Sequence, residues 1–285
     1  MGSERVGRFF HCRAAQVGLY RPAMNPAFDT NRPNWYGTWT LYRREVQRFL
    51  KVYTQTVLGP IVSTHLFLAV FALALGRASG IVGGVPFLEF LAPGLIMMGL
   101  AQNAFANTSS SVFISKVQGN IIDTLMPPLS ADELTFALAA GGVSRGLFVA
   151  TAVGLCMSLF VPIHFHNVGF IVFHAVAAAL MMSLIGLIAG IWAEKFDHMA
   201  AITNFLVAPL AFLSGSFYSI ERLPEVVRVI SHLNPFFYMI DGFRYGFIGH
   251  SDGTLGTGIA VLTGVNLVLW LICRALFASG YKLKS

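Results

Sequence analysis

The stretch VGFIVFHAVAAALMMSLIGLIAGIW, residues 168–192, contains no Asp, Glu, Lys or Arg. A helix of this length crosses the hydrocarbon core of a bilayer, for which about 20 apolar residues are needed. The stretch therefore predicts a membrane-spanning helix.

The composition of the whole chain is that of a multi-pass membrane protein. Of its 285 residues, 55% are hydrophobic and 11% are charged, and the mean hydropathy is +0.68. A soluble domain carries about 25% charged residues, so this chain has too little polar surface to stay in water. The predicted fold is an all-α polytopic membrane protein with six transmembrane helices, at about 56–76, 88–115, 133–160, 168–192, 199–219 and 255–278.

Lys and Arg are distributed unevenly between the two sides that these spans define. If the amino terminus is cytoplasmic, 15 of the 19 Lys and Arg residues lie on the cytoplasmic side. The exceptions are Arg77, Arg222, Arg228 and Arg244. Because Lys and Arg stay on the cytoplasmic side, we expect both termini there. Anionic lipid headgroups then account for the net charge of +6, and no nucleic-acid partner is expected.

The amino-terminal region divides into two parts. Residues 1–34 are basic and contain three prolines, which indicates a loosely ordered cytoplasmic arm with no apolar core for a cleaved signal peptide. Residues 35–53 instead show an apolar stripe at spacings of four and three, formed by Trp35, Trp39, Tyr42, Val46, Phe49 and Tyr53.

The opposite face of segment 35–53 is basic. Arg44 and Arg48 lie on it, and Glu45 is placed to pair with Arg48. This arrangement predicts an amphipathic helix lying in the headgroup plane. The alternative is a cytoplasmic helix packed on its own protein.

The second predicted span is polar towards its cytoplasmic end. Asn103, Asn107 and Ser110 or Ser111 fall on one face, close to Gln102. Because amides avoid lipid, this face should meet either another helix or a water-filled path. In the third span, Arg145 needs a partner or a wet cavity, unless it marks the headgroup level.

The loop over residues 116–133 is punctuated by Gly119 and by Pro127–Pro128, which leaves room for a short helix. That helix, Asn120–Leu125, projects the apolar residues Ile121, Ile122 and Leu125. It either packs beneath its own bundle or forms a knob for a partner's groove.

A proline-broken segment separates the last two spans. One short helix starts at Pro224, and Asn234–Pro235 ends it before an aromatic second helix. Neither piece is long enough to span, so the pair should dip in from the outer surface. Asp241 and Arg244 are one turn apart and are expected to neutralise each other.

Small residues recur at four-residue spacing in two spans and predict helix-packing faces: Gly186 with Gly190, and Gly256, Ala260 and Gly264. His164 and His166 lack a third ligand nearby, so no metal site is expected. The chain contains no GxxxxGK[ST] motif and no catalytic constellation at the membrane surface, so we expect neither an enzyme nor a cofactor of its own.

Several motifs together resemble the ABC-2-type permeases, the membrane subunits of bacterial ATP-binding-cassette exporters, and within them the YadH-like branch. The resemblance runs from about Tyr36 to the carboxyl end. The motifs that carry it are LYRREVQRFLKVYTQT (41–56), LAPGLIMMGLAQNAFANTSSSVF (91–113), GNIIDTLMPPLS (119–130), GGVSRGLFV (141–149) and LSGSFYSIERLP with HLNPFFYMIDGFRYGF (within 213–247).

The resemblance implies a homodimer in the bacterial inner membrane, with residues 35–285 as the transmembrane domain. Two separate nucleotide-binding subunits would bind ATP and Mg. An ATPase-coupling helix is implied at Gly119, Asn120, Ile121, Ile122, Asp123, Thr124 and Leu125. A gate helix is implied at Trp39, Tyr42, Arg43, Arg44, Glu45, Arg48 and Phe49. A translocation path is implied at Gln102, Asn103, Asn107, Ser110, Thr203 and Asn204, and an external hairpin at Pro224, Pro235, Asp241 and Arg244.

The expected function is therefore export of an amphipathic, lipid-linked, glycan or drug-like substrate, driven by the partner ATPase. The alternative is a secondary transporter or channel that works without ATP. That alternative would require a repeat of the fold and ionisable residues near mid-membrane. The ionisable residue that the predicted spans place nearest mid-membrane is His65, whereas Arg145 and Arg274 lie nearer the ends of their spans.

Overall fold

The computed structural model describes residues 33–75, 80–218 and 224–283. The unit Pro33–Ser285 is described here by itself. The predicted arm over residues 1–34 lies almost wholly outside the described residues, as do Arg77 and Arg222.

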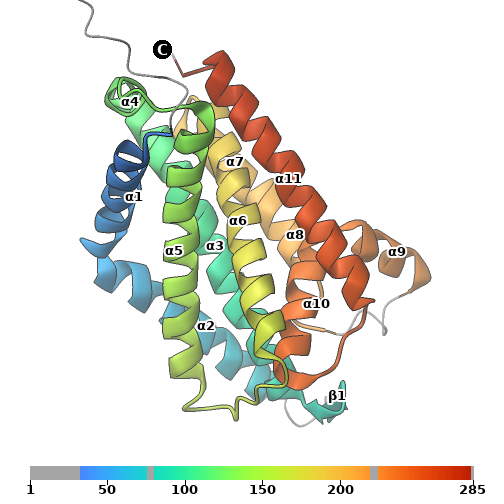
Figure 1. Cartoon of the computed structure of the whole chain (residues 1–285). Helices are drawn as coiled ribbons and strands as arrows, with labels where there is room; N and C mark the ends of the chain where they lie inside the picture. Colours follow the sequence, from blue (N-terminus) through green and yellow to red (C-terminus); the bar gives the residue numbers. More distant parts are fainter. Residues whose placement is uncertain (1–32, 76–79, 219–223, 284–285) are drawn as a thin grey trace, which may run out of the picture. The chain divides into compact units, whose positions relative to one another are not determined.

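The described chain is a helical bundle, which confirms the predicted all-α class (Figure 1). Its one sheet in the described part is a small hairpin of β1 (Ile81–Val82) and β2 (Val85–Pro86). Five described helices are long and apolar enough to cross a membrane: α2 (Tyr53–Leu75), α3 (Phe87–Val117), α5 (Ala131–Met157), α6 (Val168–Trp192) and α11 (Leu255–Ser279).

The predicted fifth span is shorter than the others. α7 (Phe196–Ile202), a π-helical turn η1 (Thr203–Val207) and α8 (Ala208–Phe212) follow one another as one apolar helix. This helix ends at Phe212 because Ser214 and Ser216 donate hydrogen bonds to the Ala211 carbonyl and Gly215 has φ +73°. Serine hydroxyls that bond the backbone compete with the helix, and a positive φ ends it. The predicted boundary at residue 219 is therefore wrong.

The core is centred on α3, which packs between α5 and α6. Gly186 and Gly190 of α6 face α3, where an added Cβ would lie 2.6 Å from the Phe105 carbonyl oxygen and 2.8 Å from that of Ser109. This confirms the predicted packing face on α6, because only glycine permits such an approach. Gly256 and Gly264 of α11 instead meet no atom within 4 Å in the described chain, so the second predicted face is not used for packing within it.

The predicted helical hairpin consists of α9 (Glu225–Leu233) and α10 (Pro235–Ile248). Asn234 forms the break, because its side-chain oxygen accepts from Phe236 N at 3.0 Å and its amide donates to the Leu210 carbonyl at 2.8 Å. The two halves differ in burial. α10 is buried beside α6 and α3, whereas α9 projects from the bundle (Figure 1).

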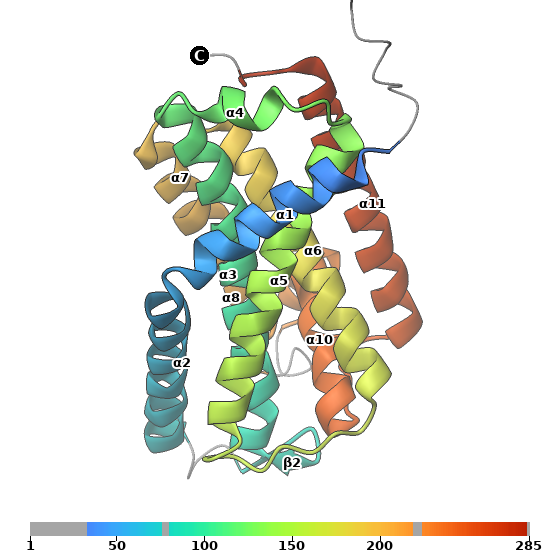
Figure 2. The ribbon, with the colours of Figure 1, turned by 60° about the vertical axis from the view of Figure 1, so that its left-hand side comes forward.

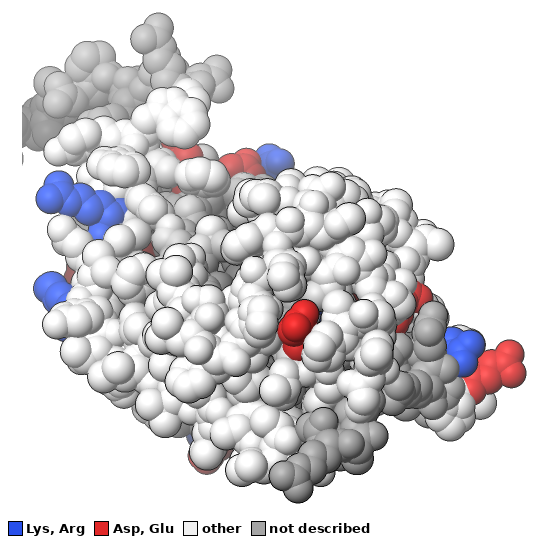
Figure 3. All heavy atoms as spheres, turned by 90° about the horizontal axis from the view of Figure 1, so that it is seen from below, with Lys and Arg blue, Asp and Glu red and all other residues white. Residues whose placement is uncertain are grey.

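One end of the bundle gathers α1 (Trp35–Leu50), α4 (Ile121–Leu125) and the last turn of α11 (Figure 2). Lys282, just beyond α11, donates to Glu194 Oε1 at 2.7 Å. This hydrogen bond lowers the pKa of Glu194 and raises that of Lys282. Figure 3 shows the other end, where most of the surface carries neither Lys or Arg nor Asp or Glu.

Candidate functional site: the α1–α4 end of the bundle

The short helix α4 presents two different sides. Ile121 and Thr124 are buried against the chain's own bundle, with exposed fractions of 5% and 6%. Ile122 and Met126 are exposed, at 59% and 76%. The inner side of α4 thus packs beneath its own bundle, which is the first alternative, and the outer side is left exposed. The prediction for Leu125 is only partly met, because it is half-buried and Met126 takes the outward position.

The start of α1 is tied to the start of α5. Asn34 caps α1 by accepting from Gly37 N at 2.9 Å, and its own backbone N–H donates to Glu133. Glu133 also accepts from Ser130 N at 2.7 Å and so completes a capping box. The Ser130-x-x-Glu133 spacing indicates the start of α5, but no sequence signal indicated that Glu133 also reaches Asn34.

A side chain of α1 also contacts α4 directly. Arg44 Nη2 donates to Thr124 Oγ1 at 3.0 Å. Since Thr124 is buried and the donor is charged, this hydrogen bond is of the stronger kind. The two segments expected to be the gate and coupling helices are therefore joined.

The face that α1 presents to the bundle differs from the predicted stripe. Its buried residues are Thr38, Leu41, Glu45 and Phe49, whereas Trp39 is 61% exposed. Trp39 and Phe49 are ten residues apart, which on a helix of 3.6 residues per turn separates them by about 80°. Only the Phe49 edge of the predicted stripe therefore meets the protein, and the exposed tryptophan at its other edge favours the headgroup-plane interpretation.

Glu45 is almost completely buried, at 1% exposure. Its carboxylate forms the predicted ion pair with Arg48, at 3.0 Å, and accepts from Ser111 Oγ at 2.9 Å. A buried charge is costly unless it is paired and hydrogen-bonded. Gly141 of α5 allows the approach, because a Cβ there would lie 2.6 Å from Glu45 Cβ.

The polar face of α3 meets other helices. Arg48 Nη2 donates to the Asn107 carbonyl at 2.6 Å and to Asn107 Oδ1 at 3.1 Å, and its Nη1 donates to Ser110 Oγ at 3.2 Å. Arg145 has the partner that its position in α5 requires, because its Nη2 donates to Asn103 Oδ1 at 3.3 Å. This face was expected to meet either another helix or a water-filled path. The structure shows the first, because the face contacts helices α1 and α5.

The six residues expected to line a path thus divide into two groups. Asn103, Asn107 and Ser110 face the α1–α5 side. The exposed residues are Gln102, Thr203 and Asn204. Gln102 and Thr203 together line a small cavity of about 60 Å³ between α3 and the α7–α8 helix. Thr203 and Asn204 open the π-helical turn η1, a geometry that often marks functional sites.

Asp241 and Arg244, which were expected to neutralise each other, interact through their charges but not through a direct contact. Among the described residues, no ion pair or hydrogen bond joins them directly. Arg244 Nη2 donates to the Gly215 carbonyl at 2.6 Å, and its guanidinium lies 3.9 Å from the centroid of the Phe90 ring.

Asp241 has separate partners before α11. It accepts from the backbone N–H groups of Asp252, at 2.8 Å, and Gly253, at 3.1 Å, and from Ser251 Oγ at 2.8 Å. Two charged residues one turn apart on a helix can each bond to a different neighbour when backbone donors or acceptors lie closer to them than the other charged side chain does.

The five spanning helices, the shorter apolar helix and the buried polar contacts between helices define a multi-pass α-helical membrane protein. A model of the ABC-2 type transporter family matches residues 36–248. The chain belongs to this family and is a membrane permease of an ABC transporter. This membership favours the ABC permease over the alternative of an ATP-independent transporter or channel.

Relatives extend over most of the chain. The inner membrane transport permease YadH of Escherichia coli strain K12 is 37% identical over 251 residues, which are 88% of this chain and 98% of the relative. Nodulation protein J of Neorhizobium galegae is 22% identical, over 80% of this chain and 87% of the relative. That of Rhizobium leguminosarum bv. viciae is also 22% identical, over 85% and 93%. The similarity to an inner membrane permease, together with the spanning helices, indicates an inner membrane protein.

Proposed function

We propose that this chain is the permease subunit of an exporter, driven by a separate ATPase that docks on α4. ATP and Mg bind to that partner, and this chain carries out no hydrolysis. The supporting observation is the hydrogen bond from Arg44 to Thr124, since it joins the outward-facing α4 to α1.

The docking surface on α4 consists of Ile122 and Met126. Both are apolar and exposed, and they lie four residues apart on one side of the short helix. Such side chains fit an apolar groove of a partner protein. Ile121 holds α4 to the bundle from the other side.

A displacement of α4 would reach the membrane through α1. The first step uses the Arg44–Thr124 hydrogen bond, and the Asn34–Glu133 contact also ties α1 to α5. From α1, the Arg48 hydrogen bonds to Asn107 carry the displacement to α3. Because packed helices move as rigid bodies, closure of the ATPase pair shifts the bundle between two states.

The substrate path is assigned to the face with Gln102, Thr203 and Asn204, between two copies of this chain. These exposed polar residues suit an amphipathic, lipid-linked, glycan or drug-like molecule that moves outward. The α9–α10 hairpin closes the path on the outer side, with both termini in the cytoplasm. The position of α1 and the carboxyl end of α11 at the same end of the bundle supports this orientation (Figure 2).

Copurification with the co-expressed ATPase subunit tests the proposal. We expect the ATPase to be retained by the unaltered chain and lost from the double variant Ile122→Asp/Met126→Asp. Leu159→Asp is the matched control, because Leu159 is an apolar residue of 80% exposure after the other end of α5. Equal retention in the double variant and in the control would refute docking on α4.

A further inference from the structure

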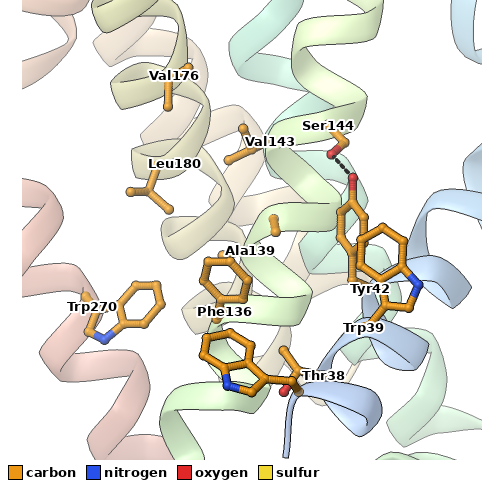
Figure 4. A pocket seen from close by; sticks show the side chains of 12 residues that line it. Thr38, Trp39, Tyr42, Phe136, Ala139, Val143, Ser144, Val176, Leu180 and Trp270 are labelled. Atoms are coloured by element: carbon orange, nitrogen blue, oxygen red, sulfur yellow. Dashed lines mark hydrogen bonds between the residues drawn. The ribbon is translucent and has the colours of Figure 1, made fainter. Parts of the chain in front are cut away.

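An apolar groove opens between α1, α5, α6 and α11. Its volume is about 560 Å³, which lies within the usual range for small-molecule sites. Figure 4 shows Trp39 and Tyr42 on one wall and Trp270 on the opposite wall, with Phe136 between them.

Several polar groups of this groove are already engaged by the protein. Tyr42 OH and Ser144 Oγ are 2.9 Å apart and hydrogen-bonded (Figure 4). Trp270 Nε1 donates to Asp132 Oδ1 at 3.4 Å. The lining therefore offers an occupant mainly apolar and aromatic surface, which suits a hydrocarbon chain and not a peptide or nucleotide.

The surroundings of the groove indicate that this hydrocarbon chain belongs to a membrane lipid. Three walls are helices of membrane-spanning length, so we expect the groove to lie within reach of lipid. On α1, which forms the fourth wall, Trp35 and Trp39 line the groove, and Arg43 follows them at the same four-residue spacing outside the lining. Tryptophan is enriched at the membrane–water interface, and basic residues beside it attract anionic headgroups.

Arg43 is exposed and is well suited to bind a headgroup. It forms no hydrogen bond or ion pair with any residue in the described part of the chain. By contrast, its neighbours Arg44 and Arg48 are held by Thr124 and Asn107.

We propose that this groove binds one acyl chain of a membrane phospholipid, with the lipid phosphate beside Arg43. The occupant is an anionic phospholipid of the leaflet on the α4 side. Because α1 forms one wall, the bound lipid would brace α1 against α5 and α6. This inference does not depend on ATPase docking.

Native mass spectrometry of the chain, extracted from bilayers of phosphatidylethanolamine and phosphatidylglycerol, tests the inference. We expect phosphatidylglycerol to remain bound to the unaltered chain. Val176→Trp fills the groove and should weaken retention by about tenfold or more, which corresponds to about 1.4 kcal/mol. Val172→Trp is the matched control, since Val172 lies one turn away on α6, is 55% exposed and does not line the groove.

A second variant tests the headgroup contact and does not fill the groove. Arg43→Gln should lower retention of phosphatidylglycerol more than that of phosphatidylethanolamine, whose ammonium group already offsets its phosphate charge. This test stands even if Val176→Trp fails to fold. Unaltered lipid retention in a folded Val176→Trp chain would overturn the proposal. So would loss of subunit association without loss of lipid, which would place a second copy in the groove. Lipid binding that appears only after removal of residues 1–32 would assign the groove to the chain's own amino-terminal arm.

Discussion

Arg44 in α1 and Thr124 in α4 are 80 residues apart in sequence, yet the Arg44 guanidinium donates a hydrogen bond of 3.0 Å to the Thr124 hydroxyl. The hydroxyl is part of the buried side of α4, opposite the exposed Ile122. This charge-assisted contact gives a force on the exposed side of α4 a direct route to α1.

Replacing Thr124 with valine keeps the size of the side chain and removes the acceptor. A hydrogen bond to a charged group contributes about 1.5–3 kcal/mol, so we expect weaker coupling between α4 and α1. A spin label at Lys51→Cys, at the end of α1, should lose its ATP-dependent change in mobility while the ATPase still copurifies.

The matched control is Thr40→Val. The Thr40 hydroxyl is exposed and, within the part of the chain that the structure describes, bonds to the Tyr36 carbonyl of its own helix alone, so the ATP-dependent change should persist. If Thr124→Val keeps the full change, movement does not pass through this contact.

Glu45→Ala should destabilise the protein by about 1–3 kcal/mol, because it removes a buried carboxylate that pairs with the partly exposed Arg48 and accepts from Ser111. Thermal unfolding in detergent measures the loss. Gln47→Ala, at an exposed position of the same helix, should change the stability little. Equal unfolding temperatures for the two variants would show that the buried ion pair contributes no stability.

Gly186→Ala and Gly264→Ala form a matched pair within the membrane. An alanine Cβ at residue 186 would lie 2.3 Å from Thr108 Oγ1, whereas residue 264 has open space. We expect a loss of about 1–3 kcal/mol for Gly186→Ala. For Gly264→Ala we expect no loss and a gain of up to about 1 kcal/mol. Destabilisation of the assembled protein by Gly264→Ala would instead indicate that α11 meets another subunit there.

A double variant in which Asp241 and Arg244 are exchanged should not keep the stability of the unaltered protein. Each side chain has its own partners, Arg244 at Gly215 and Phe90, and Asp241 at the backbone before α11. The doubly exchanged protein should therefore be at least as unstable as Arg244→Ala in a thermal unfolding assay. Recovery in the exchanged protein would favour the mutual neutralisation expected from the sequence.

The sequence predicted most of the fold because hydrophobic length is a local property. The run 168–192 coincides with α6 at both ends, and Asn234–Pro235 separates α9 from α10 as predicted. The end of the predicted fifth span was wrong because Ser214 and Gly215 redirect the backbone within an otherwise apolar run.

Side-chain partners could be predicted only where they lie within one helix. The Glu45–Arg48 pair is separated by three residues and was found. The contacts of Arg48 with Asn107 and of Arg145 with Asn103 depend on how the helices cross. The polar residues of α3 therefore indicated that partners were needed, but not which residues the partners are.

Photo-crosslinking from α4 tests the central claim most directly. A photoreactive amino acid at residue 122, in the complex assembled with the ATPase, should form a covalent adduct with that subunit. The same group at residue 159, beyond the opposite end of α5, should form none. An intact complex that gives an adduct from residue 159 and none from residue 122 would contradict docking of the ATPase on α4.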